Sequence, residues 1–147
     1  MALEGTPHRA RERFERAWAI RRDDYDACIA AHFMARHQAT SAATLEWNQL
    51  ALRHAEAVAD DRSRVFLPSL LLNLGDSLLV NGQTAEAQRA AERAKLTLGA
   101  LPDDGYREFV SRGIEGLLTR VRAALAVFCE AARRVKPGHG SFVVLLV

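Results

Sequence analysis

Apolar side chains recur along the chain at spacings of three and four residues, which is the pattern of amphipathic helices. Tyr25, Cys28, Ile29, His32 and Phe33 share one such face. The breaks between helical segments are short and polar, and no convincing alternation of two residues precedes residue 138. The pattern therefore predicts an all-α chain of six or seven helices, either a plain bundle or a helical solenoid.

Capping residues predict where several of these helices begin and end. Thr6-Pro7 combines a cap with a proline at the first helical position, so the first helix is expected to run to about Arg22. Thr44 and Thr84 are expected to cap the third and fifth helices. Asn81-Gly82 is a left-handed stop for the fourth helix, which is predicted at about 68–80. Residues 106–135 should form one long helix or two shorter ones.

Three pairs of aspartates stand at Asp23-Asp24, Asp60-Asp61 and Asp103-Asp104. Paired carboxylates can carry out acid–base chemistry, but they also satisfy the free N–H groups at a helix start. Each pair precedes a helical segment, so we interpret all three as caps.

A triplet of residues spaced i, i+4 and i+7 returns in the first, third and fifth helical segments. The copies are Ala10, Phe14 and Ala17; Asn48, Leu52 and Ala55; and Ala87, Ala91 and Ala94. Their last members lie 38 and 39 residues apart. A period in this range on helical hairpins indicates a stacked repeat protein.

The best copy, residues 68–101, resembles a tetratricopeptide repeat. It reads Leu71-x-x-Leu74-Gly75-x-x-Leu78 and then Ala87-x-x-x-Ala91-x-x-Ala94. The chain departs from the family's pattern because leucines replace two aromatics and Ala91 replaces a phenylalanine. The resemblance implies that Gly75 and Ala87 are small because the two helices of the pair touch there.

The resemblance also implies an architecture and a binding surface. The fold would be a right-handed superhelical array of antiparallel helix pairs over residues 1–136, followed by an apolar tail, 137–147. The packing positions would be Leu71, Leu74, Gly75, Leu78, Ala87, Ala91 and Ala94. A concave groove would be lined by Phe33, His37, Leu72, Asn73, Asp76, Leu79, Arg107, Val110 and Ile114.

Such a groove implies an adaptor or scaffold that binds another protein or a peptide, because a rigid groove lowers the ordering cost of binding. Some family members clamp a terminal carboxylate with Lys and Asn. Here Phe33 and His37 replace the first two clamp residues, so a mixed apolar and polar groove is expected. The alternative is a domain of a bacterial-type regulator that senses a small ligand or a signalling peptide.

The distribution of charge and the absence of known motifs argue against nucleic-acid binding, metal binding and catalysis. The net charge is +2, with basic ends and an acidic middle, which we interpret as solvated helix surfaces rather than a nucleic-acid interface. Cys28 and His32 lie on one helix face, but they lack further ligands for a metal. We find no phosphate loop or catalytic motif. The chain is therefore expected to be no enzyme, to need no cofactor or metal, and to bind neither nucleic acid nor membrane.

Two features bear on location and assembly. We find no signal peptide or membrane-spanning run, so a cytoplasmic protein with two free, buried thiols, Cys28 and Cys129, is expected. An apolar stripe in the last helical segment, followed by the apolar 142–147 run, predicts a homodimer through the C-terminal part. The alternative is a monomer in which the 142–147 run folds back over that stripe. The stripe consists of Leu117, Val121, Leu125, Phe128, Ala132 and Val135.

Overall fold

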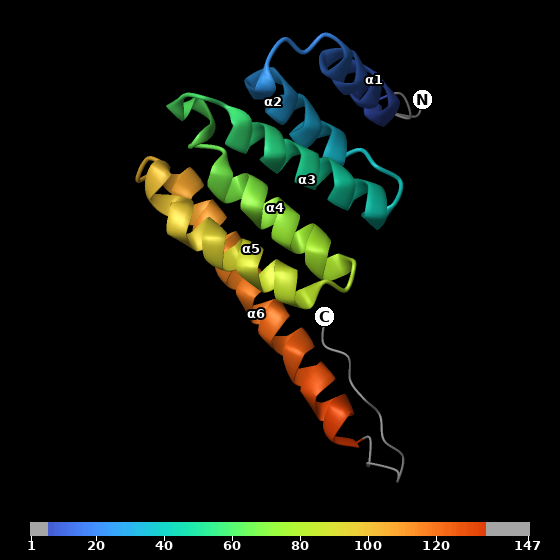
Figure 1. Cartoon of the computed structure of the whole chain (residues 1–147), viewed down its shortest axis with the longest axis vertical. Coiled ribbons are helices and arrows are strands. Elements are labelled where there is room, and N and C mark those ends of the chain that lie inside the picture. The colour runs from blue at the N-terminus through green and yellow to red at the C-terminus, as the bar shows by residue number, and fades with distance from the viewer. Residues whose placement is uncertain (1–5, 135–147) are drawn as a thin grey trace.

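The computed structural model describes residues 6–134, and these residues form helices and connections without a strand (Figure 1). The helices are α1 (Thr6–Ala19), α2 (Asp24–Ala35), α3 (Ser41–Ala57), α4 (Leu67–Val80), α5 (Thr84–Thr97) and α6 (Gly105–Arg134), with 3-10 turns η1 (Asp61–Ser63) and η2 (Leu98–Ala100). The predicted all-α class and helix number are confirmed over this range. The predicted tail, 137–147, lies outside the described residues.

The helices follow one another in space in the order of the chain. Each helix packs against the next, and α6 packs against both α5 and α4. Figure 1 shows α1 to α5 stacked side by side, while α6 runs behind α5 and its second half projects beyond the others. None of the described helices combines the length and apolar character that crossing a bilayer requires.

The aspartate pairs cap helices, as the sequence predicted. The Asp23 carboxylate accepts a hydrogen bond from the Asp26 N–H at 2.8 Å, and Asp60 accepts one from the Arg62 N–H at 2.9 Å. Asp104 accepts from the first N–H groups of α6 at 3.0 and 3.1 Å. These bonds satisfy donors that have no partner inside the helix.

Other predicted helix ends were wrong. Helix α3 begins at Ser41, because the Thr40 hydroxyl, rather than Thr44, accepts the capping bond from the Ala43 N–H at 3.1 Å. Thr84 lies inside α5 and caps nothing. The first helix ends at Ala19 rather than Arg22. The stop at Gly82 is confirmed, since this glycine has a left-handed φ of 78°.

Small side chains build much of the core. Helix α5 contributes four buried alanines, and α2 contributes another four, which allows neighbouring helices to approach closely. One continuous cluster of buried residues runs from α2 to α6. All the predicted packing positions are buried: Leu71, Leu74, Gly75, Leu78, Ala87, Ala91 and Ala94.

Helix α6 is a single helix of 30 residues, which settles the choice between one helix and two. Its first half is buried through Val110, Ile114, Leu117 and Val121. Cys28 is buried as predicted, but Cys129 is exposed, because it lies in the half of α6 that no other described helix covers.

Candidate functional site

Helix α2 presents its bulky side chains to a groove and its small ones to the core. Ile29, His32 and Phe33 are half-buried, whereas Ala27 and Ala31 are buried. The alanines allow α3 to pack closely on α2, which leaves the larger side chains on the side that faces α1 and α4. This arrangement places three apolar or aromatic groups at a partly open surface.

A partly open hollow of about 150 Å³ lies between α2, α4 and the start of α6. Helix α2 supplies one wall, α4 supplies the opposite wall, and α6 contributes one aromatic side chain. The Phe66 ring also lies 5.9 Å from the ring of Tyr25, which supports it from the α2 side. The lining consists of Cys28, Ile29, His32, Phe33, Phe66, Ser69, Leu70 and Tyr106.

The lining carries no Asp, Glu, Lys or Arg. Burial lowers the pKa of His32, and the nearby positive charge of Arg36 lowers it further. The imidazole is therefore neutral at pH 7, because its ordinary pKa is already about 6.5. The hollow thus favours an uncharged group.

Cys28 and His32 do not form an activated nucleophile. Burial raises the pKa of the Cys28 thiol to about 11, so its thiolate is scarce at neutral pH. Among the residues that the structure describes, no group of three or more His, Cys, Asp or Glu side chains is placed to hold a metal ion.

Polar contacts hold the walls of the hollow in position. The Asn73 amide nitrogen lies 3.5 Å from His32 Nδ1 and joins α4 to α2. The buried Asn48 of α3 donates to the Ser77 hydroxyl at 2.6 Å, and that hydroxyl donates to the Asn73 carbonyl at 2.9 Å. These bonds link three helices next to the hollow, so its shape is set before any ligand binds.

A second, wider hollow of about 570 Å³ lies on the other side of α2, against α1. Ile29 and Phe33 line both hollows, so they form a ridge between them. The Phe14 ring stacks on Phe33 at 4.8 Å, which anchors α1 to this ridge. The other lining residues are Ala17, Ile20, Arg21, Arg22, Asp26 and Ala30.

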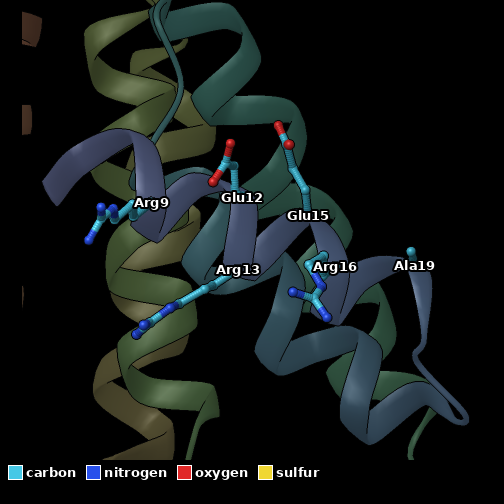
Figure 2. A pocket seen from close by; sticks show the side chains of 6 residues that line it. All are labelled: Arg9, Glu12, Arg13, Glu15, Arg16 and Ala19. Atoms are coloured by element: carbon cyan, nitrogen blue, oxygen red, sulfur yellow. The ribbon is translucent and has the colours of Figure 1, made fainter. Parts of the chain in front are cut away.

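The outer face of α1 is also slightly hollowed, but its chemistry is different. Figure 2 shows Arg9, Glu12, Arg13, Glu15 and Arg16 projecting from one helix without converging on a common point. Opposite charges alternate there, and Arg11 pairs with Glu15 at 2.8 Å. A single helix lines this face, so it encloses little, and we interpret it as a solvated surface.

Four of the predicted groove residues, which lie on α2, just after it and on α4, already have neighbours. Phe33 and His37 both stack on Phe14, at 4.8 and 5.3 Å. Asn73 reaches His32, and Asp76 pairs with Arg120 of α6 at 2.5 Å. Only Phe33 of these four lines the hollow between α2 and α4.

The other five predicted groove residues lie elsewhere. Leu72 packs on Gly113, and Leu79 is half-buried against the core. Arg107 lies 3.8 Å from Asp103 and lines a surface formed by η2, the turn before α6 and α6 itself. Val110 and Ile114 are core residues with 1% and 0% exposure, so they are inaccessible to a partner.

Most of the hollow's lining, including Ile29, Phe66 and Tyr106, lies outside the groove residues predicted from the sequence. Ile29 was assigned to an apolar helix face, without a distinction between its core side and its groove side. Phe66 and Tyr106 stand just before α4 and at the start of α6, outside the repeat positions. Two aromatics at helix starts that neighbour each other in the predicted array could have indicated this site.

Comparison of the chain with protein-family models, curated proteins and solved structures gives no match.

Proposed function

We propose that the chain binds a segment of another polypeptide and takes one of its apolar side chains into the hollow between α2 and α4. The observation that carries the proposal is the size and uncharged lining of that hollow. A cavity of roughly 150 Å³ lined by apolar side chains can hold a benzene ring. The hollow therefore suits one Phe or Leu side chain.

The size of the hollow also bears on the alternative of a small effector. Pockets that enclose whole small ligands usually measure about 300–1,000 Å³ and bury most of the ligand. This hollow is smaller, and Tyr106 at its edge is half-exposed. A side chain anchored there would leave its own backbone outside, which favours a peptide over a free small molecule.

The arrangement of helices supports a repeat-type groove. In this proposal α2 with α3 and α4 with α5 are successive helix pairs, and α6 begins a third. The hollow then belongs to the first helices of the pairs, α2, α4 and α6, which form the groove in tetratricopeptide-like arrays. The contact of Gly75 with the Ala87 carbonyl of α5, 3.5 Å from the position of an added Cβ, supports this interpretation, because a small residue is expected where paired helices touch.

The two hollows beside α2 suggest how a partner is recognised. Packed helices lie about 8–10 Å apart, so the two hollows are separated by roughly one helix spacing. A partner that crosses α2 would place one apolar side chain on each side of the Ile29 and Phe33 ridge. Arg36 lies close to His32 and forms no ion pair with another described residue. It therefore favours a partner with an acidic residue next to the side chain that enters the hollow between α2 and α4.

The proposal gives the site a binding role without catalysis. The raised pKa of Cys28 and the neutral state of His32 suit a desolvated anchor pocket rather than an activated nucleophile.

A random-peptide library selected against the full chain tests the proposal. We expect the selected peptides to share an apolar or aromatic residue, and we expect Ile29→Glu to abolish their binding, because a carboxylate would then border both hollows. Leu96→Glu is the matched control, since Leu96 is 86% exposed on α5 and should tolerate the charge. Peptides that bind both variants equally well would refute this site.

The small-effector alternative is tested by titrating the chain with phenol-sized aromatic compounds. The effector would be favoured by two results together. The compounds would bind saturably to the parent chain but not to Ile29→Glu, and the peptide library would yield no binder. We expect the opposite pattern.

A further inference from the structure

The second half of α6 carries an apolar face that no described residue covers. The buried stripe of α6 ends at Val121, Leu125 is half-buried, and residues 126–134 are all exposed. Figure 1 shows this half projecting beyond the other helices. Phe128 is 73% exposed although it continues the stripe that is buried in the first half.

This face is uncharged and is built mostly of small residues around Phe128. Helical periodicity places Ala124, Leu125, Ala131 and Ala132 beside Phe128 on one face. The charged residues lie on the other side, where Arg133 and Arg134 pair with Glu130 of the same helix. The face thus consists of one large knob with alanines at i−4, i+3 and i+4.

We propose that this face packs antiparallel against the same face of a second copy of the chain, with the two Phe128 rings near the two-fold axis. Knobs-into-holes packing inserts each large side chain between small residues of the partner helix. Phe128 supplies the knob, and the surrounding alanines supply the hole. A two-fold interface needs a surface that is complementary to itself, and this face meets that condition.

The position of the helix bundle selects the antiparallel arrangement. Helices α4 and α5 cover the same stripe of α6 at Val110, Ile114 and Leu117. A parallel partner would bring its own α4 and α5 into the space that these helices already occupy. An antiparallel partner places its bundle beyond the end of α6, where the two bundles do not collide.

The charges also fit this arrangement. Glu130, Arg133 and Arg134 lie away from the proposed contact and already neutralise one another in part. Two copies can therefore meet without opposed arginines in the centre of the interface. The same apolar stripe of α6 is covered by α4 and α5 in its first half and would be covered by the second copy in its second half.

Sedimentation of the full chain at micromolar concentration tests the proposal. We expect a dimer, and we expect Phe128→Glu to raise its dissociation constant roughly 30-fold or more, the effect of losing a central interface side chain. Ala126→Glu is the matched control, because Ala126 is also exposed but helical periodicity places it on the opposite side of α6 from Phe128. It should leave the dimer intact.

Cross-linking through Cys129 tests whether the part of α6 around Phe128 lies at the centre of the contact. Cys129 is the exposed cysteine of the described residues and neighbours Phe128, so a short bismaleimide should join the two copies through it. Circular dichroism of both Glu variants should show unchanged helix content, since both positions are exposed. A full chain that is monomeric would overturn the proposal. Slow reaction of Cys129 with a maleimide in such a monomer would point to coverage of the face by residues 135–147 of the same chain. A dimer that Phe128→Glu leaves intact would overturn it as well.

Discussion

Leu117 of α6 lies directly over Gly75 of α4, with its Cδ2 atom 2.5 Å from the position that a Cβ at residue 75 would occupy. The Ala87 carbonyl of α5 is 3.5 Å from the same position. The sequence predicted the approach to Ala87, and this approach is confirmed, but the tightest neighbour belongs to a third helix. Gly75 therefore lies where α4, α5 and α6 meet.

Substitution of Gly75 should measure this packing. We expect Gly75→Leu to lower the free energy of unfolding by roughly 1–3 kcal/mol, because the added atoms overpack a site whose neighbour Leu117 is fully buried. Gly116→Ala is the control, since no atom lies within 4 Å of its added Cβ and alanine favours a helix by up to about 1 kcal/mol. Urea titration should show changes of opposite sign, and a Gly75→Leu protein as stable as the parent would contradict the packing.

The side chain of the buried Asn48 should stabilise the fold more than that of its neighbour Gln49. Asn48→Ala removes the donor to the Ser77 hydroxyl and leaves a cavity between α3 and α4, so we expect a loss of about 1–3 kcal/mol. Gln49→Ala changes a half-buried residue on the next position and should cost less. Equal thermal shifts for the two variants would show that the Asn48 bond contributes little.

The helix positions could be predicted from the sequence because local signals determine them. Asp23 and Asp60 accept bonds from nearby N–H groups, and Gly82 adopts a backbone conformation that other residues avoid. These features depend on the chain within three or four residues. Thr40 was missed in favour of Thr44 because both are hydroxyl residues near the same break, and a one-turn shift leaves the pattern plausible.

The faces of the helices were harder to predict, because they depend on which helix packs closest. On α2, the alanines face the core and the larger Ile29 and Phe33 face the groove, the reverse of what side-chain hydrophobicity suggests. On α6, Leu72 of α4 packs on Gly113, and Val110 and Ile114 are buried in the core. Projection of the α4 geometry onto α6 could not include this packing, because it involves residues of two helices far apart in the sequence.

The Cys28 thiol should react only when the chain opens. Burial raises its pKa to about 11 and leaves it 1% exposed, so both access and thiolate are lacking in the folded state. In a Cys129→Ser chain at pH 8, we expect a maleimide to label Cys28 slowly, and quickly once urea unfolds the protein. Rapid labelling of the native chain would show that the hollow opens to solvent, since Cys28 lines it.

The lowered pKa of His32 should make the folded state less stable in mild acid. Between its ordinary pKa of about 6.5 and the lowered folded value, the unfolded chain binds a proton that the folded chain excludes. The free energy of unfolding should therefore rise with pH across this window, and the penalty should be complete below the folded pKa. His32→Gln removes the group, so the difference in stability between parent and variant should depend on pH only in this window. Urea titrations of both proteins from pH 4 to 8 measure that difference. A constant difference would mean that His32 has the same pKa in the folded and unfolded chain, and that the hollow is as hydrated as the surface.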